Sequence, residues 1–222
     1  MRFSPLAQNL WSLGGLVFWL VAYVLMIRRG VRDRSYSMPV IGLAFNVAWE
    51  LYYSVFSQAP AVERIGVGMY LALDLGVLWT CFRFGPEDFR SDLVRRWFRP
   101  GLAVMLGTAF LLIRQFAIAF NDEVGHLSAS IIVMVYSMLL IAMLLRRDSV
   151  RGQSLYIAIC ILMGDLCGAF MGLAAQQNLG ADAGMVAWIV TANAVILACN
   201  VLYLTLYVRL ARRDGVPLWS RA

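Results

Sequence analysis

The amino-acid sequence predicts an all-α integral membrane protein: a bundle of seven transmembrane helices with the N-terminus outside and the C-terminus in the cytoplasm. Hydrophobic residues make up 61% of the 222 residues and charged residues only 14%. Soluble globular domains average about 45–50% and about 25%. A soluble core of this length cannot cover so much apolar surface, so the composition favours lipid as the surrounding medium.

Seven apolar runs are long enough to cross a bilayer. Each has about 18–25 residues, which at about 1.5 Å of rise per residue spans a hydrocarbon core of about 30 Å. The period-two alternation that is typical of a membrane barrel is missing from the sequence. Connections are short, so we expect one domain over residues 1–222. The predicted spans are residues 10–27, 38–56, 65–82, 101–120, 127–145, 155–175 and 184–208.

The arginines predict the orientation. All nineteen basic residues are arginine, and sixteen of them fall in the connections on one side of the predicted membrane or after the last span. Only Arg2 and Arg64 lie on the other side, and Arg114 falls within a span. The positive-inside rule makes the arginine-rich side cytoplasmic. The longest connection, residues 83–100, mixes charged and aromatic residues, so we expect it to form an interfacial helix on the membrane surface.

Several classes of protein are excluded or disfavoured. The absence of lysine excludes a retinal Schiff base, a pyridoxal phosphate enzyme and a P-loop lysine. The four cysteines form no CxxC pair, which gives no support for a disulfide framework or a zinc site. Aspartate-rich runs that hold magnesium and a prenyl diphosphate are absent, as are hydrolase, protease and nucleotide-binding motifs. We therefore expect no metal, no cofactor and no nucleic-acid partner.

Four ionisable residues fall within the predicted spans: Glu50, Asp74, Arg114 and Asp165. Each costs at least about 2.5–3.5 kcal/mol to place in a bilayer, which makes each a candidate functional residue. The helix rise puts all four about 12–20 Å from the cytoplasmic ends of their helices. The sequence therefore predicts a shared polar pocket inside the membrane.

Neighbouring side chains strengthen the case for Glu50. Asn46 and Tyr53 lie on the same helical face as Glu50, and Trp49 flanks that face. A carboxyl group in a low-dielectric medium keeps its proton more readily, so it can protonate an alkene or epoxide or carry a proton across the membrane. Aromatic faces nearby stabilise a carbocation. The alternative is that the buried charges and amides pair with one another and only stabilise the bundle.

The motifs resemble those of a known family. Residues 45–50 (Phe-Asn-Val-Ala-Trp-Glu) resemble the Asn-x-x-Trp-Glu element on helix two of the small seven-span membrane-bound terpene cyclases. These are the cyclases of fungal meroterpenoid and indole-diterpene pathways and their bacterial relatives. Length, helix number and motif order match over essentially the whole chain. Further similarity lies in Leu73-Asp74-Leu75 with Trp79, in residues 120–123 and in residues 151–158.

The resemblance implies a metal-free cyclisation of a polyprenyl tail that is initiated by protonation, with Glu50 as the essential acid of helix two. The family also carries an acidic residue on its last helix, in a pattern like Asp-x-x-Tyr. Here Asn200 precedes Tyr203 in that pattern, and an asparagine cannot serve as an acid. Either Glu50 acts alone with Asn200 as a hydrogen-bond partner, or Asp165 supplies the second carboxyl group.

We therefore hypothesise a membrane terpene cyclase whose partners are the bilayer and a lipid-soluble prenylated substrate, with a prenyltransferase or an epoxidase acting upstream. We expect the bacterial cytoplasmic membrane as its location. The alternative from another class is a proton-coupled transporter or ligand-binding protein that uses the carboxylates as a relay, although no inverted repeat supports it. The predicted catalytic residues are Glu50, Asp165 and Asn200. The predicted substrate contacts are Asn46, Trp49, Tyr53, Tyr70, Asp74, Trp79, Arg114 and Tyr203.

Overall fold

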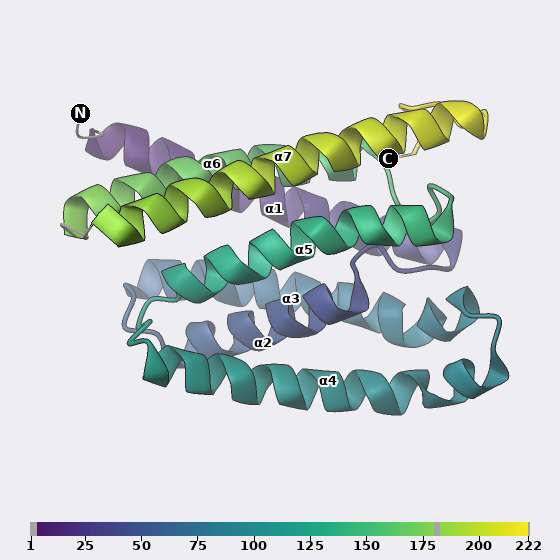
Figure 1. The fold of residues 1–222 in the computed structure, drawn as a ribbon, viewed down its shortest axis with the longest axis horizontal. Helices are drawn as coiled ribbons and strands as arrows, with labels where there is room; N and C mark the ends of the chain where they lie inside the picture. Colours follow the sequence, from purple (N-terminus) through teal and green to yellow (C-terminus); the bar gives the residue numbers. More distant parts are fainter. Residues whose placement is uncertain (1–3, 180–182, 222) are drawn as a thin grey trace.

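The protein is built from α-helices, as predicted, and no strand occurs in the described part of the chain. The computed structural model describes residues 4–179 and 183–221. The helices run along one common direction (Figure 1). They are α1 (Pro5–Asp33), α2 (Val40–Phe56), α3 (Ala61–Phe84), α4 (Asp92–Ala119), α5 (His126–Arg147), α6 (Leu155–Leu179) and α7 (Ala183–Arg213), with a 3₁₀ turn, η1 (Gly85–Asp88), between α3 and α4.

Each predicted span falls on one of these helices. Where a span extends past the end of its helix, it does so by at most two residues. Six helices are long and apolar enough to cross a membrane, and α2 is shorter at 17 residues. Helix α2 starts directly after Pro39, whose ring disfavours a helical conformation of the residue before it. The apolar runs therefore predicted the number and order of the helices correctly.

The expectation of an interfacial helix over residues 83–100 was wrong. Helix α4 begins at Asp92 and continues through Pro100 to Ala119 without a break. Its start is capped by Ser91, whose hydroxyl accepts a hydrogen bond from the Val94 amide at 3.5 Å. Because proline usually interrupts a helix, the sequence pattern placed the start of this span after Pro100.

Six of the helices form a closed ring. Going around it, α1 packs on α3, α3 on α2, α2 on α5, α5 on α7, α7 on α6, and α6 again on α1. Helix α4 lies outside this ring, mainly against α2, and borders the bundle in Figure 1. The interior of the ring is therefore enclosed by helices that are far apart in the sequence.

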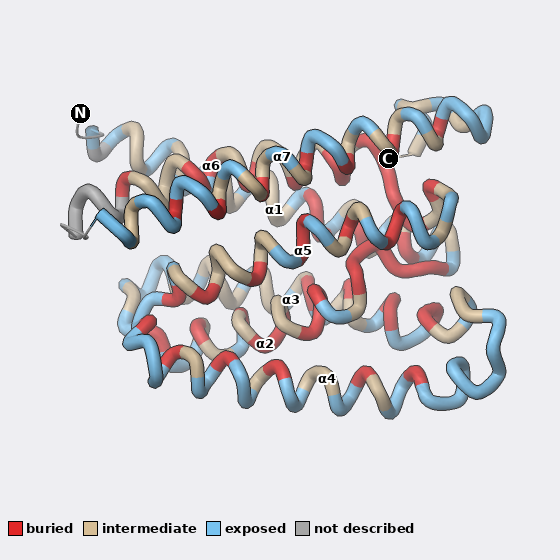
Figure 2. Tube along the Cα trace, viewed as in Figure 1, coloured by how far each residue is buried: buried red, intermediate tan, exposed pale blue. Residues whose placement is uncertain are grey.

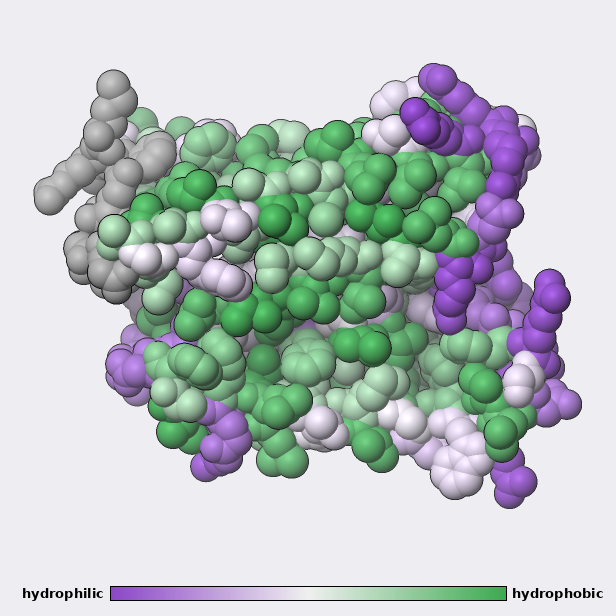
Figure 3. Space-filling view, in the orientation of Figure 1, coloured by the Kyte–Doolittle hydropathy of each residue, from purple (hydrophilic) through white to green (hydrophobic). Residues whose placement is uncertain are grey.

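The outer surface of the bundle is apolar. Buried residues face the neighbouring helices, and exposed residues follow the outward sides (Figure 2). Large apolar side chains such as Val104, Leu111 and Ile118 of α4 are exposed. Figure 3 shows hydrophobic residues along the middle of the molecule, with hydrophilic ones gathered toward its ends. A surface of this kind is matched to lipid and would aggregate in water.

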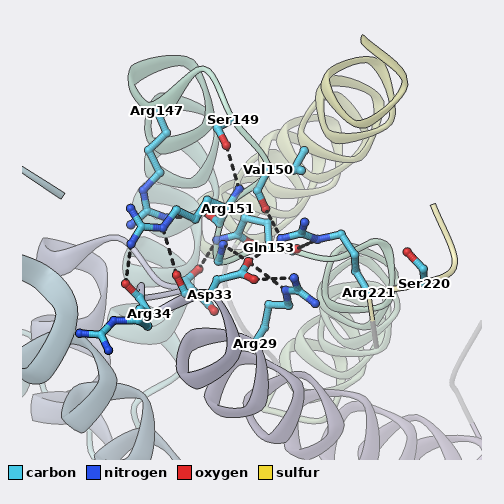
Figure 4. A network of polar contacts seen from close by, with 12 residues as sticks. Arg29, Asp33, Arg34, Arg147, Ser149, Val150, Arg151, Gln153, Ser220 and Arg221 are labelled. Carbon is cyan, nitrogen blue, oxygen red and sulfur yellow. Dashed lines mark hydrogen bonds and ion pairs between the residues drawn. The ribbon is translucent and has the colours of Figure 1, made fainter. Parts of the chain in front are cut away.

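Charged side chains concentrate at the end of the bundle that carries the α1–α2, α3–α4 and α5–α6 connections and the residues after α7 (Figure 3). We call it the arginine-rich end. Asp33, at the last residue of α1, is the centre of an ionic network there (Figure 4). Its carboxylate accepts hydrogen bonds from Arg29 Nε at 2.9 Å, from the Gly152 amide at 2.7 Å and from the Arg221 guanidinium. The network ties α1, the α5–α6 connection and the C-terminal segment together.

A second ion pair stabilises the same end. Arg147 Nη2 lies 2.5 Å from Asp88 Oδ2, and both side chains are buried. Arg147 Nη1 donates to the Tyr36 carbonyl at 2.9 Å, and its guanidinium stacks 4.2 Å from the centre of the Tyr36 ring. Burial raises the pKa of the Tyr36 phenol above its ordinary value, so the phenol stays neutral. These contacts fix η1 against the connection that follows α1.

At the opposite end, Asp122 fixes the start of α5. Its carboxylate accepts hydrogen bonds from the amides of Leu127 at 3.1 Å and Ser128 at 2.8 Å, which satisfies helix donors that have no partner within the helix. The same carboxylate accepts the Tyr53 hydroxyl at 3.2 Å. Gly125 precedes the helix with a φ of 84°, a left-handed conformation that favours glycine.

We expect Asp122→Ala to lower the free energy of unfolding by about 2 kcal/mol, because the cap and the bond to Tyr53 are lost together. Thermal unfolding of the detergent-purified protein measures the effect. Glu123→Ala is the matched control, since the structure gives Glu123 hydrogen bonds only through its backbone carbonyl. Equal unfolding midpoints for the two variants would contradict the capping role.

Candidate active site

Two connected cavities lie inside the six-helix ring. The smaller, of about 150 Å³, is lined by residues of α1, α2, α3 and α5 and contains Glu50. The larger, of about 610 Å³, is lined by residues of α1, α3, α5, α6 and α7 and contains Asp165. Four residues line both cavities: Trp19, Tyr70, Ala129 and Val133. We therefore treat the two as one chamber, with Glu50 at its inner end.

Glu50 is held by one side chain of α1 and by one of its own helix, α2. It is only 2% exposed. Its Oε1 accepts hydrogen bonds from the Tyr23 hydroxyl of α1 at 3.1 Å and from Asn46 Nδ2, one turn earlier on α2, at 3.0 Å. Its Oε2 is buried and receives no hydrogen bond from an N–H donor of the described residues, and the Glu50 and Asp74 carboxyl groups hydrogen-bond to each other. The Glu50 carboxyl group is thus oriented by Tyr23, Asn46 and Asp74.

Asp74 lies behind Glu50. It is completely buried, and its Oδ2 accepts a hydrogen bond from the same Asn46 Nδ2 at 2.8 Å. Asn46 therefore bridges the two carboxyl groups. Two carboxylates cannot both be ionised at such close range in a medium of low dielectric constant, so this pair holds at least one proton.

Aromatic rings surround the inner end of the chamber. Trp19, Tyr23, Trp49, Tyr70 and Tyr136 all line the smaller cavity. Tyr23 contacts Tyr70 edge to face, with ring centroids 6.0 Å apart, and Trp19 lies between Tyr23 and Tyr136 at 5.5 and 6.0 Å. Such faces attract a cation through their quadrupole. The site therefore combines a pair of carboxyl groups that retains a proton with walls that favour positive charge.

Asp165 provides a second polar centre, in the larger cavity. It is 6% exposed, and its Oδ2 accepts a hydrogen bond from Asn200 Nδ2 of α7 at 2.7 Å. The Trp19 side chain hydrogen-bonds to the same carboxyl group. Gly164, the preceding residue, makes this approach possible, because a Cβ there would lie 2.7 Å from Trp19 Cδ1. The predicted pair of Asp165 and Asn200 is thus brought together, and Trp19, which lines both cavities, connects it with the Glu50 part of the chamber.

Five of the predicted substrate contacts do not line the chamber, among them Asp74, which lies behind Glu50. Tyr53 binds Asp122, and Tyr203 donates to Gln153 Oε1 near the arginine-rich end. Trp79 is 52% exposed on α3, and Arg114 is exposed on α4. Asn46, Trp49 and Tyr70 do line the smaller cavity. The structure therefore gathers Glu50, Asp165 and these three residues, but not Arg114, whose depth alone suggested a shared pocket.

Trp19 and Tyr23 are the residues that sequence reasoning missed. They stand four residues apart and so share one face of α1. That spacing of two aromatic residues in the first span was the available signal, but it does not distinguish a cavity wall from ordinary packing.

A cavity larger than either of the two that form the chamber lies elsewhere in the molecule. It measures about 770 Å³ and lies between α2, α4 and α5 near the arginine-rich end. Its lining includes Tyr36, Trp97 and Arg146 but no carboxylic acid. Without an acid it lacks the chemistry that distinguishes the chamber, and we do not assign the active site to it.

The fold and the chamber define an integral membrane protein with a largely apolar chamber beside a buried acid. Within that class, the chain belongs to the Pyr4-like transmembrane terpene cyclases, whose family model matches residues 3–213. This membership confirms the resemblance seen in the motifs. It identifies the chain as a membrane-bound enzyme of terpene cyclisation rather than a transporter.

Individual relatives agree with the family assignment. The chain is 32% identical over 171 residues to the terpene cyclase penB of Penicillium crustosum. The aligned region covers 74% of this chain and 68% of that protein. It is 32% identical over 171 residues to the terpene cyclase ptmB of Penicillium ochrochloron, with the same coverage. It is 24% identical over 203 residues to the terpene cyclase pyr4 of Aspergillus fumigatus, covering 88% and 83%. No solved structure matches the chain.

Proposed function

We propose that the enzyme cyclises a farnesyl-type prenyl chain, free or attached to a scaffold, by protonating it from Glu50. The observation that supports this most directly is the carboxyl group of Glu50, which lines the inner end of the chamber and is held there by Tyr23 and Asn46. The chamber has the size and apolar aromatic lining that a folded isoprenoid requires. Its acid is held in the water-poor interior of the ring.

The first step transfers the Glu50 proton to an alkene carbon, or to the oxygen of an epoxide, and leaves a carbocation and a Glu50 carboxylate. Tyr23 and Asn46 stabilise that carboxylate through hydrogen bonds to Oε1. The aromatic walls stabilise the cation while the rings close. The scheme requires Asp74 to keep a proton of its own at this point, because Asn46 bridges it to Glu50 and two neighbouring carboxylates would repel each other.

The last step requires a base, and Asp165 is placed to serve. It lines the larger cavity, and its side chain is oriented by Asn200 and Trp19. Removal of a proton from the final cation gives a neutral alkene. Exchange with solvent then returns Glu50 to its acid form and Asp165 to its basic form. In this scheme Asn200 is a positioning residue, which agrees with its complete burial.

We expect Asp165→Asn to change the products as well as the rate. The amide keeps the shape and the contact with Asn200 but is a far weaker base, so the rate should fall about tenfold to a hundredfold. Cations that are no longer deprotonated at their usual carbon should give isomeric alkenes or alcohols. Gas chromatography with mass spectrometry measures both changes. An unaltered rate and product pattern would rule out Asp165 as the base.

The surroundings of the enzyme follow from the same hypothesis. We place the arginine-rich end in the cytoplasm by the positive-inside rule. The relatives named above are fungal, so they give no support to the expected bacterial membrane, and we retain only an integral multi-pass location. A prenyltransferase, and for an epoxide substrate an epoxidase, would have to act before this enzyme.

A direct test incubates the purified protein with farnesyl-substituted aromatic compounds and with their terminal epoxides, without added metal. The proposal expects cyclic products of the same composition as the substrate. With an alkene substrate, deuterated water should introduce one deuterium at the carbon that Glu50 protonates, where it does not exchange. Cyclic products of the alkene without deuterium from the solvent would contradict protonation as the first step.

A further inference from the structure

The chamber has a second polar region that the proposed chemistry does not use. The larger cavity extends toward the end of the bundle opposite the arginine-rich end, where the first turns of α1, α3 and α5 contribute to its lining. Asn9, Glu63 and His126 line the cavity there. We call these three residues the rim.

The rim lies far from Glu50 along the helix axes. Glu63 precedes Tyr70 by seven residues on α3, which corresponds to about 10 Å, and Asn9 precedes Trp19 by ten residues on α1, about 15 Å. Tyr70 and Trp19 line both cavities. A chain whose terminal unit lies beside Glu50 therefore extends past these two residues, and its other end comes out at the rim.

The rim residues are available for a ligand. Among the described residues no side chain forms a hydrogen bond or ion pair with the Glu63 carboxylate, although Arg64 is its neighbour and binds the carbonyls of Ser54 and Val55 instead. Trp11 lines the same cavity and stacks on Phe170 of α6, with ring centroids 4.4 Å apart. This places a flat aromatic wall beside a carboxylate that accepts hydrogen bonds.

The charged groups of the chamber further restrict the chemical class of the head group that it can bind. Its described lining contains the carboxyl groups of Glu50, Glu63 and Asp165 and no arginine. An anionic head would be repelled by the carboxylates and would find no guanidinium to bind. A neutral head with hydroxyl or N–H donors fits both the carboxylate and the aromatic wall.

We propose that the rim of Asn9, Glu63 and His126 binds the neutral head of the prenylated substrate, with Glu63 accepting a hydrogen bond from a hydroxyl or N–H group of that head. The inference rests on the proposed function for the position of the tail. It adds the direction in which the substrate lies, tail inward and head at the rim. It also names residues that select the scaffold without taking part in the proton transfers.

Equilibrium binding separates this inference from catalysis. The experiment uses protein in lipid nanodiscs that carries Glu50→Gln, so that no probe is turned over. The probes are a farnesyl-substituted phenol, its methyl ether and farnesene, a hydrocarbon without a hydrogen-bond donor, and binding is followed by quenching of tryptophan fluorescence. Adding Glu63→Gln should raise the Kd of the phenol about tenfold, the usual effect of losing a hydrogen bond to a charged group. The Kd of the methyl ether and of farnesene should change less than about twofold.

Glu123→Gln, in the same background, is the matched control, because Glu123 is an exposed carboxylate near the same end that lines neither cavity. It should leave all three Kd values unchanged. Equal binding of phenol and ether, no binding of any probe, or an equal loss for all three probes on Glu63→Gln would each overturn the proposed role of the rim. Failure of the proposed function has a different signature: selective binding at the rim, but no cyclisation of any probe by the unaltered enzyme.

Discussion

Replacing Glu50 by glutamine is expected to lower the rate of cyclisation by about a hundredfold to ten-thousandfold, the usual contribution of a general acid. Glutamine has nearly the same shape, and its Oε1 can still accept the hydrogen bonds of Tyr23 and Asn46. It has no acidic proton to transfer. The variant should therefore fold and bind substrate normally while failing to start the reaction.

Steady-state product formation with a saturating prenylated substrate measures this effect. Glu50→Asp should recover part of the rate, because it restores an acid but withdraws it from the bound chain by one methylene group. Glu123→Gln should behave like the unaltered enzyme. If Glu50→Gln cyclised its substrate at the original rate, the proton would have to come from another acid, and the proposed mechanism would fail.

The largest expected effect on stability comes from Asp33→Ala. Asp33 interacts with Arg29, Arg221 and the Gly152 amide in the network of Figure 4. Both arginine side chains are largely buried. Without Asp33 the two guanidinium groups lose the anion that they share and remain poorly solvated. This should lower the free energy of unfolding by about 3 kcal/mol or more. The first element to separate should be the C-terminal segment, because Arg221 is held by this contact and by bonds to the carbonyls of Gln153 and Val150.

Thermal unfolding in a fixed detergent measures the loss, and limited proteolysis of the C-terminal segment shows where it begins. Asp92→Asn is the control, because Asp92 is 96% exposed in its pair with Arg95 at 3.7 Å. Exposed pairs contribute about 0–1 kcal/mol, so that variant should unfold close to the original midpoint. Equal midpoints for the two variants would show that the Asp33 network does not stabilise the bundle.

The helices were predictable because each one has to present an apolar side to lipid over its full length. The runs around Leu111 and Ile196, for example, are sufficient to place α4 and α7. Pro100 was misleading, since its effect on a helix depends on neighbours that the sequence does not show. The extent of α4 beyond the apolar run was therefore not predictable.

The candidate site was predictable only in part. The cost of burying a charge singled out Glu50, Asp74 and Asp165, and all three are buried in the structure. Helix rise gives the depth of a residue, but it does not give the side of the helix that faces the ring. Arg114 has the right depth and lies on the outer helix, α4. The bridge from Asn46 to both Glu50 and Asp74 also required the three-dimensional arrangement.

The order of the helices that line the Glu50 cavity has a consequence for biosynthesis. During synthesis α2 leaves the ribosome before α3 and α5, so Glu50 enters the membrane while one side of its future pocket is still open to lipid. An uncharged carboxylic acid is the form that a bilayer admits at the lowest cost. The protonated acid that the chemistry requires is therefore also the form that favours insertion of the unfinished protein.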